Sequence, residues 1–343
     1  MSLTIDRRTF LGASASLLAV PRAMAAPFVQ PPVARVILDN DFAGDPDGLF
    51  QLAHHLLCRS VRIPLIIGSH LPARFGSGHD AVDSAQRAAD IVRLLGLAGS
   101  YRPLAGAETP LGSAGSAVRS AATAPIVREA LREDTRVPLI YAAGAGLTEL
   151  ALAWRADRRI GRRLRLIWIG GNTHSDVAPP GAMDREPEFN FSIDPVAAQL
   201  IFNESDIEIW QVPSATYRTM LFGTGELDEL GGTGPLGAYL KAAVDSVPAM
   251  LARIPGFPPL PQTDAYVLGD SPLVTLSALV TPFAADPASS DYRLMPTPRL
   301  NPDGSYTARA EGRPMRVYTR IDTGLTFRDM MARFRLEALR AGR

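Results

Sequence analysis

The sequence predicts a single α/β domain in which an open, mostly parallel sheet carries helices on both faces. Short apolar segments rich in β-branched residues alternate with turns and helical segments, which is typical of repeated strand–helix units. The strand segments show no alternation of apolar and polar residues, as expected for strands covered on both faces. A length of 343 residues, with 46% hydrophobic and 20% charged residues, is sufficient for one large domain with a sizeable core.

The alternation of strands and helices can be followed along most of the chain. We expect strands at residues 33–38, 61–67, 137–142, 164–169 and 207–212, and helices at residues 46–57, 81–95, 147–156 and 195–202. Asp194 followed by Pro195 predicts an N-cap with proline in the first helical turn. Residues 223–263, rich in glycine, proline and leucine, are expected to cap the site with short helices and loops. Residues 273–280 predict a buried helix, and residues 286–325 predict a terminal hairpin with a turn at residues 301–304.

The first 25 residues predict an export signal rather than part of the fold. Residues 6–12 resemble the twin-arginine signal, the apolar run 11–20 suits the central region of such a signal, and residues 23–25 read Ala-Met-Ala, a small-x-small cleavage site. A membrane anchor is the alternative, but the apolar run is too short to span a bilayer. We therefore expect a cleaved signal at residues 1–25, a domain at residues 26–343, a periplasmic or secreted location, and no membrane attachment after cleavage.

Charge and cysteine usage narrow the classes of function. The formal net charge is zero, with 35 basic and 35 acidic residues, so nothing indicates a nucleic-acid partner. Cys58 is the only cysteine, so the domain has no intramolecular disulfide. It lies in an apolar run after two histidines, which favours a buried structural thiol over a nucleophile.

A group of acids directly after the first expected strand is the main chemical signal. Asp39, Asp41, Asp45 and Asp47 are separated by small and turn-forming residues. Carboxylates this close raise one another's pKa values unless a cation lies among them. Crowded hard oxygen ligands are what Ca²⁺ or Mg²⁺ requires, and in a parallel sheet ligands bind beyond the carboxyl ends of the strands. The segment therefore predicts a metal site that acts on a polar, oxygen-rich substrate.

Several segments together resemble the nucleoside hydrolase family, also called the inosine-uridine preferring nucleoside hydrolases. Asp39-Asn40-Asp41 resembles the family's opening motif, although the residues that follow are one position longer and include Pro46. The other matching segments are residues 142–151, 168–171, 188–198, which resemble the Glu-Phe-Asn motif, and 266–273, which resemble the late His-Asp-Pro motif. The resemblance implies a Rossmann-like nucleoside hydrolase fold and hydrolysis of the N-glycosidic bond of ribonucleosides to free base and ribose.

The resemblance also implies a role for each matching residue. It implies one Ca²⁺ whose ligands are Asp41, Asp47, Asp270 and the backbone carbonyl of Gly144. It implies that the ribose hydroxyls are bound by Asp45, Glu188, Asn190 and Asp270. Asp41 would also act as the catalytic base, and the extra residue leaves the roles of Asp45 and Asp47 exchangeable. Asp39 would be a supporting acid, although its position alone is equally consistent with a cap of the next helix.

Departures from the family pattern concern the leaving-group end of the pocket. The histidine that in some members protonates the leaving purine is Gly269 here, and an asparagine of the family is Ala182. Candidates for another acid at this end are Tyr217, His174 and Asp184. Ser69 or His70 replaces a further asparagine of the family and is a candidate ribose contact, whereas His54 and His55 are expected to be structural.

Different functions remain open on the sequence alone. The first is an exported, calcium-dependent N-ribohydrolase of nucleosides, and the second is a hydrolase of another riboside or sugar-like compound. The third is a periplasmic riboside-binding protein without turnover, although Asp41 favours catalysis because binding alone needs no base. Members of the family commonly form dimers or tetramers, so a homodimer or homotetramer is expected. No pattern of apolar residues in the sequence distinguishes between the two assemblies.

Overall fold

The computed structural model describes residues 30–112, 117–179, 181, 184, 186–254, 256–283 and 288–342. The predicted signal at residues 1–25 and Ala182 lie outside the described residues. Residues Pro32–Arg343 form one compact unit. Within the described part, no helix has both the length and the apolar character needed to cross a membrane.

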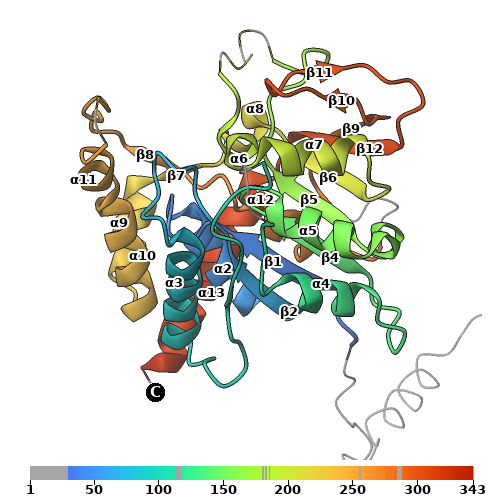
Figure 1. Ribbon diagram of the computed structural model, residues 1–343. Coiled ribbons are helices and arrows are strands. Elements are labelled where there is room, and N and C mark those ends of the chain that lie inside the picture. The colour runs from blue at the N-terminus through green and yellow to red at the C-terminus, as the bar shows by residue number, and fades with distance from the viewer. Residues whose placement is uncertain are drawn as a thin grey trace, which may run out of the picture. The chain divides into compact units, whose positions relative to one another are not determined.

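An eight-stranded sheet forms the centre of this unit, with the strand order β3-β2-β1-β4-β5-β6-β12-β9 (Figure 1). Neighbouring strands are parallel from β3 to β12, and the edge strand β9 is antiparallel to β12. The strands are β1 (Ala34–Asn40), β2 (Val61–Gly68), β3 (Leu104–Ala105), β4 (Leu139–Ala143), β5 (Arg165–Ile169), β6 (Glu208–Val212), β9 (Asp291–Pro296) and β12 (Pro314–Arg320). The order reverses between β1 and β4, which places a ligand crevice beyond their carboxyl ends. The predicted open, mostly parallel sheet is confirmed.

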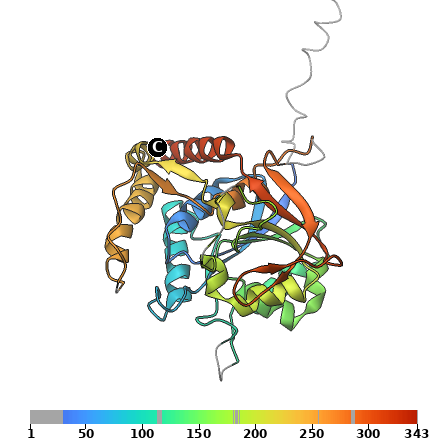
Figure 2. The same ribbon diagram turned by 90° about the horizontal axis from the view of Figure 1, so that it is seen from above.

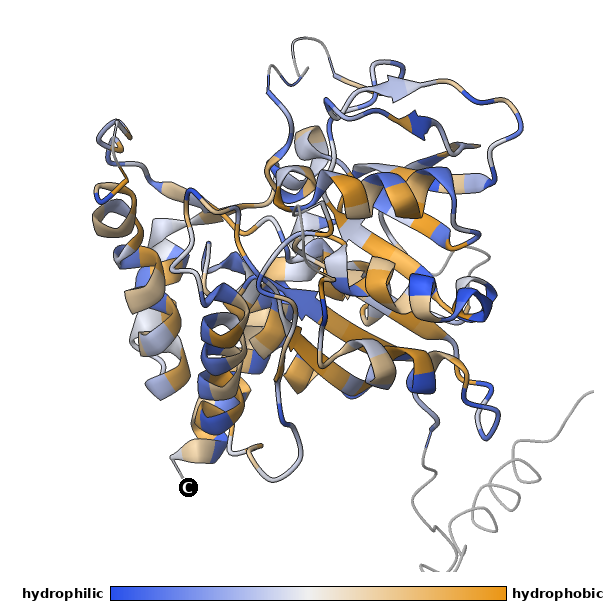
Figure 3. Cartoon of the chain, viewed as in Figure 1, coloured by the Kyte–Doolittle hydropathy of each residue, from blue (hydrophilic) through white to orange (hydrophobic). Residues whose placement is uncertain are grey.

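Helices pack against both faces of the sheet, as the view from above shows (Figure 2). One face packs against α2 (Asp47–Leu57), α3 (Asp80–Leu94), α12 (Pro272–Ser277) and α13 (Thr323–Ala341). In the same core, α10 (Pro235–Asp245) packs against α3 and α13, and α9 (Thr224–Gly231) packs against α13. The other face packs against α4 (Thr123–Ala130), α5 (Thr148–Ala156) and α7 (Pro195–Asn203). β1 contributes to both cores, with Val36 and Leu38 in the first and Ile37 in the second. The central strands are accordingly mostly apolar, although β1 ends in the polar residues Asp39 and Asn40 (Figure 3).

Shorter elements surround the carboxyl end of the sheet. They are α6 (Phe189–Ile193), α8 (Ser214–Tyr217), β7 (Leu221–Gly223), α11 (Val247–Leu251) and β8 (Ala265–Val267), and β7 pairs with β8. The expected hairpin is formed by β10 (Arg299–Leu300) and β11 (Tyr306–Thr307). Gly304 adopts a φ of +81° in its turn, where the backbone N–H of Gly304 donates to the carbonyl of Asn301 at 3.0 Å.

The helix boundaries follow local capping chemistry. Asp194 caps α7, since its carboxylate accepts the backbone N–H of Ala197 at 2.9 Å and Pro195 follows in the first turn, as predicted. The second carboxylate oxygen of Asp194 accepts the hydroxyl of Thr148 at 2.7 Å. This acid therefore ties α7 to the start of α5 and is a structural residue.

Candidate active site

Asp39, the first acid of the group, is a fully buried residue of β1. Its carboxylate accepts hydroxyl hydrogens from Ser69 and, at 2.6 Å, from Tyr141. Burial raises the pKa of Asp39 to about 7, and the charge of Glu149 adds to this shift. The idea that Asp39 caps the next helix is wrong, because its side chain lies inside the sheet and binds neighbouring strands.

The seven residues predicted as catalytic, substrate or metal ligands all line one cavity of about 180 Å³ beyond the carboxyl ends of β1 and β4. They are Asp41, Asp45, Asp47, Gly144, Glu188, Asn190 and Asp270. The remaining lining residues are Ile169, Phe189, Tyr217 and Gly269. The parallel sheet thus brings together side chains from segments that are far apart in the sequence. The individual roles remain predictions.

The carboxylates of this cavity lack a positive neighbour. Among the described residues, no Lys, Arg or His forms an ion pair with Asp41, Asp45, Asp47 or Asp270. Burial raises the pKa values of Asp41 and Asp47 well above the usual range, and the charge of Asp270 raises both further. Burial also raises the pKa of Asp270 to about 7. Such a group of hard oxygen donors is stable in its charged form when a cation lies among them.

Asp45 and Asp47 differ in their surroundings. Asp45 is exposed and accepts the hydroxyl of Tyr266 at 2.7 Å. Asp47 begins α2 and is less exposed; one of its carboxylate oxygens accepts the backbone N–H of Gly48 at 2.8 Å and the other accepts that of Asp270 at 3.1 Å. Asp47 is therefore held against the last acid by the backbone, whereas Asp45 lies at the mouth of the cavity.

Asn40 is a site residue that the sequence analysis did not single out. Its side chain is buried between the acids, and its Nδ2 donates to Asp270 at 2.8 Å. Its Oδ1 is buried and has no hydrogen-bond partner among the described residues. The sequence did carry a signal for Asn40, because this residue lies between two acids of the opening motif.

Gly144 lies against the last acid. An added Cβ at Gly144 would lie 2.7 Å from Asp270 Oδ1, so this position requires glycine for close approach.

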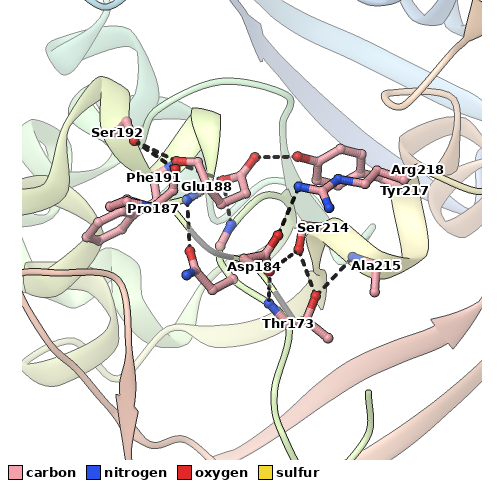
Figure 4. A network of polar contacts seen from close by, with 12 residues as sticks. Thr173, Asp184, Pro187, Glu188, Phe191, Ser192, Ser214, Ala215, Tyr217 and Arg218 are labelled. Atoms are coloured by element: carbon pink, nitrogen blue, oxygen red, sulfur yellow. Dashed lines mark hydrogen bonds and ion pairs between the residues drawn. The ribbon is translucent and has the colours of Figure 1, made fainter. Parts of the chain in front are cut away.

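Glu188 and Asn190 line the cavity from the start of α6, and Figure 4 shows Glu188 with its contacts. The carboxylate of Glu188 accepts the backbone N–H groups of Gly171 at 2.7 Å and Phe191 at 2.9 Å, and the hydroxyl of Tyr217 at 2.7 Å. Asn190 Nδ2 donates to the carbonyls of Ile169 at 2.8 Å and Gly144 at 3.2 Å. The two backbone carbonyls thereby orient the Asn190 amide. These contacts fix both side chains before any ligand binds.

The leaving-group candidates separate clearly in space. Tyr217 lines the acidic cavity, and its ring occupies the space beside Gly269, where an added Cβ would lie 3.1 Å from Tyr217 Cδ2. His174 and Asp184 instead line a different cavity, where His174 stacks on Tyr306 with ring centroids 4.0 Å apart. Asp184 binds Thr173, Ser214 and Arg218 (Figure 4). Of the three candidates, the structure places only Tyr217 among the residues that line the acidic cavity.

Other side chains singled out from the sequence have structural partners. Ser69 donates to Asp39, and His70 Nδ1 lies 3.0 Å from the carbonyl of Ala107; neither lines the acidic cavity, so the ribose contact expected of them is absent. His54 and His55 are fully buried in α2, where His55 Nε2 lies 2.8 Å from the hydroxyl of Ser277. The structural interpretation of these two histidines is confirmed.

A second group of potential metal ligands lies at the other end of α2. One ligand atom each of His54, Cys58 and Asp329 lie within 4.8 Å of one another. Asp329 already binds His54 at 2.9 Å and Arg333 at 2.5 Å. Burial raises the pKa of the Cys58 thiol to about 12, so the thiolate that a metal needs is disfavoured. We interpret this group as a structural contact between α2 and α13.

Comparison with known sequences adds a family assignment. The sequence model of the family described as inosine-uridine preferring nucleoside hydrolase matches residues 50–290, which begin just after the acid group. A segment of 61 residues is 44% identical to an inosine-uridine preferring nucleoside hydrolase of Leishmania major. This segment spans 18% of this chain and 18% of that relative's length.

Comparison with solved structures shows the same fold over nearly the whole chain. A plant nucleoside hydrolase has a TM-score of 0.65 at 17% identity, covering 88% of this chain and 99% of its own. A purine-preferring ribonucleoside hydrolase from Gardnerella vaginalis has a TM-score of 0.63 at 16% identity, covering 89% and 99%. An inosine-uridine preferring nucleoside hydrolase from Bacillus anthracis has a TM-score of 0.60 at 16% identity, covering 88% and 99%. Because the family model matches well over half of the chain, the protein belongs to the inosine-uridine preferring nucleoside hydrolase family, which confirms the family that the sequence predicts.

Proposed function

We propose that this protein is a calcium-dependent hydrolase that cleaves the N-glycosidic bond of ribonucleosides and releases free base and ribose. The observation that carries the proposal is that all seven predicted site residues line one cavity. They come from four separate segments of the chain, so their meeting is a property of the fold and not of one motif. Family membership supports the reaction class, and the residues themselves support the metal.

The acidic cavity fits a hard divalent cation. Burial raises the pKa values of Asp41, Asp47 and Asp270, and the charge of Asp270 raises those of the other two further. The backbone of Gly144 lies close to Asp270, where an added Cβ would be 2.7 Å from Oδ1. This set consists of oxygen donors alone, which suits Ca²⁺ better than a metal that prefers nitrogen or sulfur. When bound, Ca²⁺ would hold the ribose diol and lower the pKa of an adjacent water.

The side chains of the cavity would then divide the chemistry. Asp41 accepts a proton from the attacking water, whose oxygen bonds to C1′ while the C1′–N bond breaks and its electron pair stays with the base. Glu188 and Asn190 hold ribose hydroxyls, since backbone contacts already fix their orientation. The ring of carboxylates stabilises the positive charge that develops on the sugar in an oxocarbenium-like state.

The direct test is ribose release from a panel of purine and pyrimidine ribosides by the mature protein, with EDTA and after calcium is restored. We expect release that EDTA abolishes and Ca²⁺ restores. Asp41→Asn should lower kcat by about 1,000-fold or more while riboside binding persists, since asparagine keeps an oxygen ligand for the metal but cannot accept the proton of the water. Asp228→Asn, an exposed acid of α9, is the matched control and should leave kcat unchanged. Riboside binding without release by the wild-type protein would instead identify a binding protein.

We also propose that the protein is exported before it acts. Residues 1–25 carry the features of a twin-arginine signal, which would place the mature chain in the periplasm or outside the cell. This route transports folded proteins and suits a large metal-loaded domain. A homodimer or homotetramer is the expected assembly, and light scattering of the mature protein distinguishes the two.

A further inference from the structure

A larger cavity adjoins the acidic one. It has a volume of about 570 Å³, and Asp45 and Phe189 line both cavities. The acidic cavity, at about 180 Å³, is smaller than the roughly 300–1,000 Å³ of sites that hold a whole small molecule. If the sugar occupies the acidic cavity, the group attached to C1′ has to extend past Asp45 and Phe189 into the larger one.

The larger cavity has apolar and aromatic walls. Phe75, on the segment after β2, lies beside Phe189, with ring centroids 5.3 Å apart and an angle of 51° between the planes. Met250 of α11 and Phe257 also line the cavity. Phe189 and Met250 are each 37% exposed, so these walls present apolar surface that no described residue covers. Walls of this kind fit a flat aromatic ring.

Two arginines add positive charge to this apolar cavity. Arg74 and Arg253 both line it, and neither forms an ion pair with another described residue. The guanidinium carbon of Arg74 lies 4.6 Å from the centroid of the Phe75 ring. Phe189 lines the acidic cavity, Phe75 packs on Phe189, and the guanidinium of Arg74 lies over Phe75. An anionic ligand would be repelled by the acids alone, and these two charges offset that repulsion.

We propose that the preferred substrate is a riboside whose leaving group is an aromatic ring carrying a carboxylate, with the ring packed against the Phe75–Phe189 pair and the carboxylate at Arg74 and Arg253. The inference rests on the proposed function and names its substrate class. Guanidinium groups bind carboxylates through paired, charge-assisted hydrogen bonds. Among the described residues that line the two cavities there is no histidine or lysine, so the site is not organised around an imidazole donor to a neutral base.

The test compares substrates that differ in one group. The ribosides of nicotinate and nicotinamide have the same shape, and so do 5-carboxyuridine and 5-carbamoyluridine. We expect kcat/KM to be at least about 10-fold higher for the carboxylate member of each pair. Arg74→Gln and Arg253→Gln should each reduce this ratio by about 5-fold, because kcat/KM falls more for the carboxylate member than for the carboxamide member. Arg62→Gln, an exposed arginine near the opposite end of β2, should change neither value.

The outcomes separate this inference from the proposed function. Hydrolysis of both members at equal rates, or an equal loss for both members in the arginine variants, overturns the inference and leaves the hydrolase function intact. No ribose from any riboside, inosine and uridine included, overturns the hydrolase function. In that case calorimetric titration of the calcium-loaded protein with the two pyridine ribosides tests the inference alone, and equal affinities overturn it.

Discussion

At the scale of single residues, the acidic cavity is ordered by neutral donors. Backbone N–H groups hold Asp47 and Glu188, and the amide of Asn40 holds Asp270. A lysine or arginine in these places would neutralise the carboxylates and compete with a cation. Neutral donors orient the carboxylate oxygens without neutralising them, so the negative charge remains available to bind the metal and to stabilise the sugar ring.

Replacing Asn40 should therefore weaken metal binding more than chemistry. In Asn40→Ser the hydrogen bond to Asp270 is lost, and we expect calcium affinity to fall by about 10–100-fold. At saturating calcium kcat should recover to within a few-fold of the wild-type value, because Asp41 is unchanged. Calcium titration followed by ribose release measures both values. A loss of kcat that calcium does not restore would contradict the positioning role.

Tyr217 provides a second test at this scale. Its hydroxyl donates to Glu188, and burial raises its pKa far above the usual range, with the charge of Glu188 adding to the shift. A phenol held in this way orients Glu188 and is a poor proton donor to a base. Tyr217→Phe should raise KM by about 3–10-fold for all ribosides alike, with little change in kcat. A kcat loss confined to ribosides with poor leaving groups would show instead that Tyr217 is the leaving-group acid.

At the scale of elements, α2 connects the acid group to the rest of the fold through a buried histidine. His55 is fully buried, with Nε2 at the Ser277 hydroxyl of α12 and Nδ1 against Gln51. Burial lowers the pKa of His55 to about 3, and the neighbouring His54 lowers it further. In the unfolded chain its pKa is about 6.5. The unfolded state therefore binds a proton that the folded state does not.

Acid should consequently destabilise the contact between α2 and α12. The contribution of neutral His55 is fully present above pH 6.5 and is lost as the pH falls toward 3. Between pH 7.5 and 5.0 the free energy of unfolding should drop by about 2 kcal/mol more in the wild-type protein than in His55→Gln. Urea denaturation at both pH values, with calcium saturating, measures the difference. Equal pH dependence of the two proteins would contradict a buried neutral His55.

The elements also show what could be predicted from sequence. The apolar runs of β1, β2 and β5 are unambiguous, and their observed limits differ from the prediction by one or two residues. Helix α13 was not predicted, although Phe327, Met330, Met331 and Phe334 follow helical spacing and are buried. The contact of Asn40 with Asp270 and the position of Tyr217 beside Gly269 were beyond sequence reasoning. Both depend on how segments distant in sequence are packed, and no local pattern encodes that.

At the scale of the whole molecule, the reversal of strand order between β1 and β4 concentrates negative charge at one place. Asp41 follows β1, Gly144 follows β4, and Asp270 arrives from the segment before α12. Folding brings these groups together and removes them from water, which would otherwise screen their charges from one another. The metal-free protein is therefore less stable than its core alone would make it, and a cation relieves that cost.

Calcium should therefore stabilise the protein more at high pH than at low pH. Burial raises the pKa of Asp270 to about 7 and those of Asp41 and Asp47 well above 3.8, so the metal-free folded state binds more protons than the unfolded state. Its stability then falls as the pH rises through 7, because each acid must be charged while buried. Calcium at about 100 times its Kd should raise Tm by roughly 5 °C at pH 8.

At pH 5.5 protons compete with the cation for the same carboxylates, so the calcium-dependent rise in Tm should be less than half as large. Each sample is compared with an EDTA-treated sample at the same pH. The loss of stability that His55 causes at low pH is independent of calcium and cancels in this comparison. Asp270→Asn removes one of the charges and should reduce the rise at pH 8 while making the metal-free protein more stable. A rise that is the same at both pH values, or larger at pH 5.5, would mean that the acids of the cavity do not share a cation.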